Sequence, residues 1–115
     1  MKDDLAPLSQ ILDRIDRLLS AGLDKQRFLA NEWDQDAVIR NLEIIGEAAK
    51  RVSAETRALS PSIPWRQVAG FRDVAIHGYD KLSLTRVWKI VDEDLPPLKS
   101  KVRSLLRELG PPRGV

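Results

Sequence analysis

Apolar residues recur at steps of three and four along almost the whole chain. This spacing is typical of helices, because an α-helix has about 3.6 residues per turn and so aligns such residues along one face. No segment alternates apolar and polar residues for long enough to predict a strand. The sequence therefore predicts an all-α fold, an up-and-down bundle of about four main helices with short helices between them. The longest series is Leu84, Val87, Trp88, Val91, Leu95, Leu98, Val102, Leu105, Leu106 and Leu109.

Capping residues and breakers indicate where these helices begin and end. A first helix carries the stripe from Leu8 to Leu19, and Asp24 is placed to cap a short helix through Leu29. A second long helix is predicted over 34–52, after which Ser53 can cap a further turn. Two short helices follow over 64–68 and 71–77, and the last long element covers 84–109.

Glycine and proline make two further predictions within these elements. Gly46 lies inside the second long helix, where glycine costs about 1 kcal/mol relative to alanine, and so it indicates a close approach of another helix. Pro96 and Pro97 lack backbone donors and disfavour helix at the preceding residue. We therefore expect a kink or a fresh start at Leu95.

Length and composition limit the architecture and the kinds of site. The 115 residues suffice for one hydrophobic core, so residues 1–109 are predicted to form one domain and residues 110–115 a flexible tail. No cysteine and a single histidine are present, which leaves no disulfide, no thiolate zinc site and no His-rich site. We expect neither a metal nor a cofactor. The acidic N-terminus leads into no apolar signal region and no segment could span a bilayer, so a cytoplasmic protein without membrane contact is expected.

The net charge of +2 means that affinity for nucleic acid requires a local basic patch. Lys99, Lys101, Arg103 and Arg107 offer either such a rim or an ordinary solvated helix face. Trp65, Phe71 and Trp88 fall on apolar stripes and are expected in the core rather than as platforms for bases.

The stretch Arg72-Asp73-Val74-Ala75-Ile76-His77-Gly78-Tyr79 concentrates reactive groups, including the single histidine and the single tyrosine. A guanidinium has a fork shaped for phosphate oxygens, and an imidazole transfers protons near neutral pH. Together these groups suit cleavage of RNA, in which the 2′-hydroxyl is an internal nucleophile and the enzyme supplies proton transfer and charge stabilisation. The alternative is structural: His77 as a helix cap or surface residue, and Arg72–Asp73 as a solvated pair.

One imidazole supplies one acid or one base. A twofold dimer that brought two copies of this stretch together would supply two imidazoles and two guanidinium groups in one cleft. If the chain is a nuclease, its single histidine therefore predicts a homodimer.

Arg72-x4-His77-x-Tyr79 matches the Arg-x4-His-x-Tyr motif of HepT-like toxins of the HEPN superfamily. Asn41-Leu-Glu-Ile-Ile-Gly-Glu-Ala-Ala resembles the Gly-Glu-Ala helix of that family, and Ile63-Pro64-Trp65 and Val87-Trp88…Asp94-Leu95-Pro96 stand in its usual order. The resemblance covers nearly the whole chain. It implies a HEPN-like helical domain and the toxin of a toxin–antitoxin pair, a dimeric, metal-independent ribonuclease that acts on mRNA or tRNA.

The resemblance also implies a partner and roles for individual residues. The partner is a minimal nucleotidyltransferase (MNT-type) antitoxin that silences the toxin by adenylylating the tyrosine of the motif, here Tyr79. His77 is the expected acid and base, and Arg72 the clamp on the scissile phosphate. Glu47 either orients Arg72 or His77 or is a surface glutamate. Asp73 stands where the family often has asparagine, and it adds negative charge beside the phosphate site.

Two other functions stay open from the sequence. The chain could be a non-catalytic helical subunit that docks and regulates a nucleotidyltransferase. It could also be a plain helical dimerisation module, in which Tyr79 would take no label from ATP.

Overall fold

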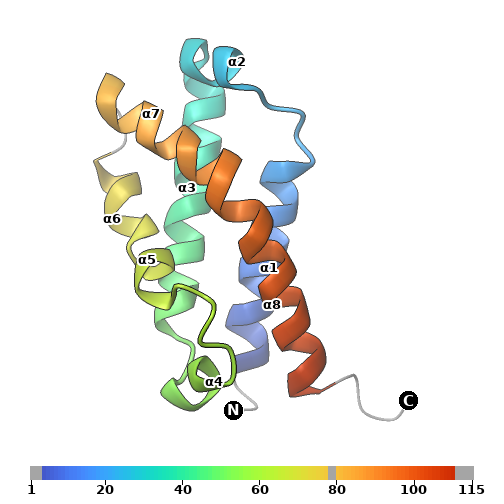
Figure 1. Cartoon of the computed structure of the whole chain (residues 1–115). Helices are drawn as coiled ribbons and strands as arrows, with labels where there is room; N and C mark the ends of the chain where they lie inside the picture. Colours follow the sequence, from blue (N-terminus) through green and yellow to red (C-terminus); the bar gives the residue numbers. More distant parts are fainter. Residues whose placement is uncertain (1–3, 78–79, 111–115) are drawn as a thin grey trace.

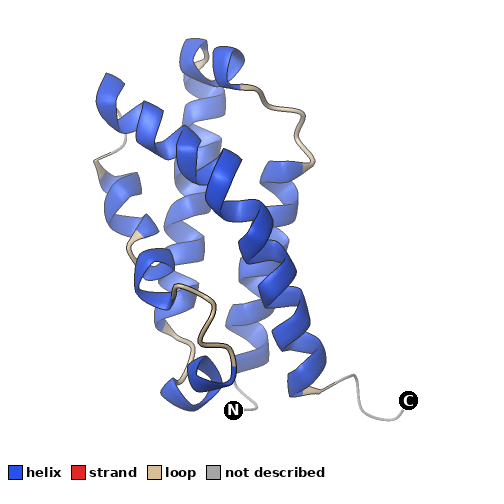
Figure 2. Ribbon diagram, in the orientation of Figure 1, coloured by secondary structure: helices blue, strands red, loops and turns tan. Residues whose placement is uncertain are grey.

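The computed structural model describes residues 4–77 and 80–110, and within them it contains helices and no strand (Figure 2). The predicted all-α class is therefore confirmed. No helix in this part of the chain combines the length and the apolar composition needed to cross a membrane. The helices are α1 (Leu5–Leu19), α2 (Lys25–Ala30), α3 (Glu32–Lys50), α4 (Ala54–Leu59), α5 (Trp65–Ala69), α6 (Phe71–Ile76), α7 (Lys81–Lys89) and α8 (Leu95–Leu109).

Helix α3 is the centre of the bundle. It packs against α1 on one side and against α5 and α6 on the other, while α8 packs against α1 (Figure 1). The stripes predicted from the sequence form the core, since Leu8, Ile11 and Ile15 of α1 are fully buried. Helix α2, the end of α6 and the start of α7 lie at one end of the bundle, and α4 lies at the other (Figure 1).

The predicted caps are present. The Asp24 side chain accepts a hydrogen bond from the Arg27 amide at 2.8 Å, and α2 follows it. The Ser53 hydroxyl accepts one from the Thr56 amide at 3.2 Å, and α4 follows it. Each cap satisfies a backbone donor that the first helical turn leaves without a partner. The long central helix begins at Glu32, slightly earlier than expected, because Asn31 caps it through the Asp34 amide.

The break expected at Leu95 takes the form of a π-helical segment, Ile90–Asp94, between α7 and α8. The Leu95 amide donates to the carbonyl of Ile90, five residues earlier, so the turn is one residue wider than an α-helical turn. Pro96 and Pro97 then occupy the first turn of α8, where the missing backbone donors cost little. The chain stays helical through this region, and the prolines widen one turn instead of ending the element.

Asp4 ties the start of α1 to the start of α4. Its carboxylate is buried, with 3% of the residue exposed. It accepts hydrogen bonds from the Ser53 amide at 2.9 Å and the Ser53 hydroxyl at 2.6 Å, and a further bond from the Thr56 hydroxyl. Burial by itself would raise the pKa of Asp4, but these hydrogen bonds together outweigh it and lower the pKa below its ordinary value.

Replacing Asp4 by asparagine is expected to lower the free energy of unfolding at pH 7 by about 1–3 kcal/mol, because buried donors lose a charged acceptor. A lowered pKa in the folded state adds stability above the ordinary carboxyl value of 3.8, and this stability is lost as the pH falls through the lowered pKa. Urea unfolding between pH 7 and pH 2 measures both effects. The control is Asp13→Asn, at a half-exposed side chain. An Asp4→Asn profile that matches the control profile would contradict the prediction.

Candidate active site

Helix α6 presents Arg72 and Asp73 on its outer side. Phe71 and Ala75 are buried against the bundle, with 2% and 1% of their surface exposed. Asp73, Ile76 and His77 are exposed, and Arg72 is partly exposed. The buried and exposed positions follow from the helical period, since Phe71 and Ala75 are one turn apart. Arg72, Asp73 and His77 therefore lie on the surface and not in the core.

Gly46 determines how closely α6 approaches α3. A Cβ atom at this position would lie 2.6 Å from the backbone nitrogen of Arg72 and 3.0 Å from the carbonyl oxygen of Ala69. Real Cβ atoms essentially never come within 3.0 Å of such atoms. The close approach predicted from this glycine is confirmed, and the helix that approaches is the one carrying the motif.

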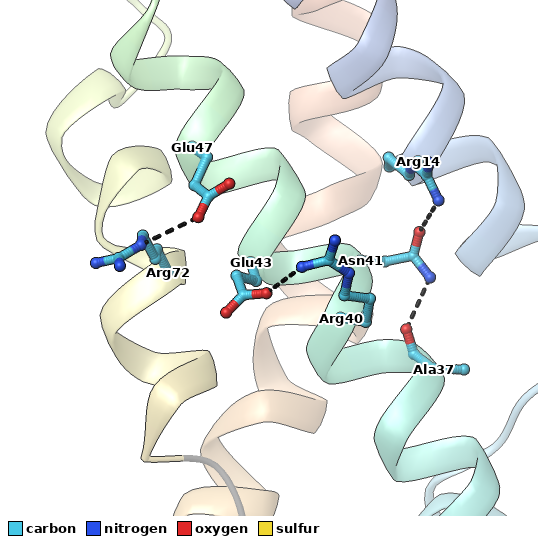
Figure 3. Close-up of polar contacts among 7 residues, drawn as sticks. All are labelled: Arg14, Ala37, Arg40, Asn41, Glu43, Glu47 and Arg72. Carbon is cyan, nitrogen blue, oxygen red and sulfur yellow. Dashed lines mark hydrogen bonds and ion pairs between the residues drawn. The ribbon is translucent and has the colours of Figure 1, made fainter.

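The close packing brings Arg72 next to Glu47, the residue that follows Gly46. The Arg72 Nε atom lies 3.3 Å from the Glu47 Oε1 atom (Figure 3). Glu47 is thus a surface glutamate that contacts Arg72, and its orienting role stays a prediction. An exposed pair of this kind contributes only about 0–1 kcal/mol to stability.

The geometry of this ion pair leaves the outer edge of Arg72 accessible. Glu47 contacts the Nε atom, and within residues 4–77 and 80–110 no hydrogen bond engages the two terminal nitrogens of Arg72. In Figure 3 the terminal nitrogens of Arg72 point away from α3. A guanidinium group held in this way can still present two N–H groups to an anion.

A second ion pair, which the sequence reasoning missed, lies beside the first. Glu43 is one turn before Glu47 on α3 and pairs with Arg40 (Figure 3). The spacing of four between Glu43 and Glu47 was the available signal, because such residues share a helix face. Both carboxylates lie on the side of α3 that α6 approaches, and each is neutralised by an arginine.

Asn41, the first residue of the stretch that resembles the family's Gly-Glu-Ala helix, lies away from the motif. Its side chain accepts from Arg14 Nη1 of α1 at 3.4 Å and donates to the carbonyl of Ala37 at 2.7 Å (Figure 3). This stretch of α3 therefore contacts two neighbours, α1 through Asn41 and α6 through Gly46 and Glu47.

His77 follows the last residue of α6 and is exposed. Within the described residues it makes no hydrogen bond with Arg72 or Asp73, so one copy of the chain does not join these groups directly. Tyr79, the expected site of adenylylation, lies outside the described residues.

The aromatic residues expected in the core are found there. Trp65 and Phe71 are buried, and the Trp88 ring packs against Phe28 with 5.5 Å between ring centroids. Two of the four basic residues that could form a rim are engaged within the chain. Lys99 pairs with Asp16 at 2.8 Å, and Lys101 donates to the Ser62 carbonyl at 2.8 Å. Only Arg103 and Arg107 of that set are exposed.

A small hollow of about 90 Å³ lies away from Arg72 and His77. Burial, followed by the charge of nearby Glu93, raises the pKa of Asp94 in its wall. No group of three or more histidine, aspartate or glutamate side chains in the described part of the chain could hold a metal ion. The hollow is lined by Pro64, Gln67, Val68, Phe71, Asp94, Pro97, Leu98 and Lys101.

The chain is similar to known proteins along nearly its whole length. It is 39% identical over 104 residues to a protein of Thermococcus cleftensis named "Probable ribonuclease HepT", which covers 90% of this chain and 94% of that protein. It is 33% identical over 110 residues to "Putative RNase MJ0125" of Methanocaldococcus jannaschii, with 94% and 95% covered. No solved structure matches it significantly. The family model described as "Ribonuclease HepT-like" matches residues 8–105, and the chain therefore belongs to the ribonuclease HepT-like family.

Proposed function

We propose that this chain is the toxin of a toxin–antitoxin pair and a metal-independent endoribonuclease. Arg72 and His77 of two copies act in one composite cleft of a homodimer, and a nucleotidyltransferase antitoxin silences the toxin by adenylylating Tyr79. Membership of the ribonuclease HepT-like family supports the reaction class. The observation that carries the proposal is the outward-facing guanidinium of Arg72 on α6, which Glu47 of α3 contacts at the Nε atom. The exposed His77 follows the last residue of the same helix.

The chemistry follows from the groups on α6. In the proposed reaction the 2′-oxygen of the RNA attacks the adjacent phosphorus, and the bond from phosphorus to the 5′-oxygen breaks. One imidazole accepts the proton of the 2′-hydroxyl, and the imidazolium of the partner copy gives a proton to the leaving 5′-oxygen. The arginines stabilise the charge that develops on the phosphate oxygens. The products are a 2′,3′-cyclic phosphate and a 5′-hydroxyl.

Glu47 has a positioning role in this proposal. A free arginine side chain samples many rotamers, whereas a carboxylate on a rigid helix limits the orientation of the guanidinium group. The charge of Glu47 is compensated by Arg72, and that of Glu43 by Arg40, which reduces the repulsion that two carboxylates would exert on an approaching phosphate. Asp73 is exposed on α6 and leaves one negative charge next to Arg72.

Adenylylation of Tyr79 would block the same cleft. An AMP group adds bulk and a negatively charged phosphate next to residues meant to bind RNA phosphates. Tyr79 is two residues from His77 in the sequence, so a modification there lies within reach of the proposed cleft.

A cleavage assay with a chelator tests the proposal. The purified chain is incubated with labelled mRNA or tRNA in excess EDTA, and the ends of the products are identified. We expect cleavage with cyclic phosphate ends, and we expect prior treatment with the nucleotidyltransferase and ATP to stop it. A Tyr79→Phe variant should escape the silencing while it still cleaves RNA.

Other results of these assays would contradict different parts of the proposal. Cleavage that requires a divalent ion contradicts the metal-independent mechanism. A tight complex with the nucleotidyltransferase, without any cleavage by the isolated chain, favours the non-catalytic regulatory subunit instead. Silencing that persists in Tyr79→Phe rules out Tyr79 as the modified group.

A further inference from the structure

Trp33 is the most exposed large apolar residue among those that the structure describes, with 84% of its surface exposed. It lies in the first turn of α3. The other two tryptophans are packed, Trp65 with 9% exposed and Trp88 against Phe28. Tryptophan is enriched among the residues that dominate binding at protein interfaces, because it supplies a large contact area with few rotatable bonds. Trp33 is therefore a candidate contact residue.

The corner formed by the end of α2 and the start of α3, which carries Trp33, is held in place by several contacts. Asn31 alone separates α2 from α3, and its side chain accepts from the Asp34 amide at 3.1 Å. Gln35, which is 8% exposed, donates to the carbonyls of Phe28 at 3.0 Å and Leu29 at 3.2 Å. The last carbonyls of α2 are thus bound by a buried side chain of α3, which fixes the two helices relative to one another.

Two more contacts hold the same corner in place. The Phe28 ring is fully buried and lies against Trp88 of α7. On the surface, Arg27 pairs with Asp34 at 2.9 Å between Nε and Oδ2. The indole of Trp33 is consequently exposed on a fixed scaffold. A fixed position reduces the entropy lost when a partner covers the side chain.

The surroundings of Trp33 indicate the chemistry of that partner. Leu29, with 40% of its surface exposed, adds apolar area on α2. Glu32 and Asp36 are exposed beside Trp33, and Asp36 shares its helix face at a spacing of three. Between residues 24 and 36 the chain has four acidic and two basic residues. This charge disfavours RNA and favours a protein with a basic surface around an apolar pocket.

The position of the corner in the bundle is also relevant. Helix α2 contacts α3 and α7, and it lies at the end of the bundle where α6 ends and α7 begins (Figure 1). Residues 78 and 79 connect those two helices in the sequence. A protein seated on Trp33 therefore lies toward the same end of the bundle as the end of α6 and the start of α7.

We propose that the α2–α3 corner, defined by Leu29, Glu32, Trp33 and Asp36, is the docking surface for the nucleotidyltransferase, which inserts the indole into an apolar pocket with a basic rim. The identity of the partner rests on the proposed function. The position and the chemistry of the surface rest on the exposed indole, its rigid support and its acidic surroundings.

The test measures the affinity of this chain for the MNT-type nucleotidyltransferase of the proposed pair, by calorimetry at two salt concentrations. Trp33→Ala is expected to weaken binding by about 10- to 100-fold, as loss of a central interface tryptophan does. Asp36→Lys is expected to weaken binding and to reduce its dependence on salt. The matched control is Leu59→Ala, at a residue 43% exposed on α4 at the opposite end of the bundle, and it should bind like the unmodified chain.

Four outcomes overturn the docking surface. Unchanged affinity of Trp33→Ala in an otherwise intact complex removes the surface and leaves the proposed function standing. Loss of RNA binding by Trp33→Ala, with unchanged affinity for the nucleotidyltransferase, reassigns the indole to RNA. Conversion of a dimer to a monomer by Trp33→Ala, measured by light scattering, reassigns it to contact between copies. If the unmodified chain forms no complex at all, the partner in the proposed function fails, and the docking surface fails with it.

Discussion

Replacement of His77 by alanine is expected to slow RNA cleavage by about 10²- to 10⁴-fold, the usual contribution of general acid–base catalysis by a side chain. Thermal unfolding should change little, because His77 is exposed at the end of α6 and outside the core. Cleavage rates under single-turnover conditions, with unfolding followed by circular dichroism, check both parts. Glu55→Ala, at an exposed residue of α4, serves as the control. Cleavage that continues at the original rate in a pure His77→Ala preparation removes the catalytic assignment.

Mixing subunits tests whether the cleft is composite. If both imidazoles are needed, random mixing of unmodified and His77→Ala chains should give activity that falls with the square of the unmodified fraction. Activity that falls in direct proportion to that fraction would mean that each copy acts alone. Mass spectrometry of the mixture verifies that exchange between the copies is complete.

Replacement of Gly46 by alanine is expected to lower the free energy of unfolding by about 1–3 kcal/mol, the usual cost of overpacking. The added Cβ would meet the backbone of Arg72 and Ala69, and these atoms move only if α5 and α6 shift away from α3. Alanine favours a helix over glycine by about 1 kcal/mol, which offsets part of the loss. The same shift would move Arg72 relative to Glu47, so cleavage should decrease as well.

Urea unfolding and cleavage assays measure the two effects of Gly46→Ala. Ala37→Ser, which enlarges an exposed side chain on the same helix, is the control and should change stability by less than about 1 kcal/mol. An alanine variant at position 46 that is as stable and as active as the unmodified chain would show that α3 and α6 can separate without consequence.

Much of the fold could be predicted because local signals agreed with the packing. Asp24 and Ser53 cap the helices they were expected to cap, and Gly46 marks a close helix contact. The form of the break before Leu95 could not be read from the prolines. Two missing donors can be accommodated by ending a helix or by widening a turn, and the packing of α7 and α8 around one core decides between them.

In the candidate site, the contacts between residues distant in sequence could not be predicted. The motif and Glu47 could both be identified from the sequence. The contact between Glu47 and Arg72 could not be predicted, because it depends on how α6 crosses α3. From the sequence, Lys99 and Lys101 could belong to a basic rim or to an ordinary solvated helix face. Their partners Asp16 and Ser62 are distant in sequence and could not be foreseen. Trp33 gave no signal of exposure, because an indole in the first turn of a helix fits either a core or a surface.

The contact at Gly46 has a consequence for how such a protein can diversify. Backbone atoms of residues 69 and 72 fix the position of α6, together with the inward residues Phe71 and Ala75. The outward side chains of that helix contribute little to this anchoring. If Arg72 and His77 act on RNA as proposed, substitutions on the outer side of α6 can alter which RNA is accepted while the bundle keeps its shape. Specificity and folding would then be free to vary independently.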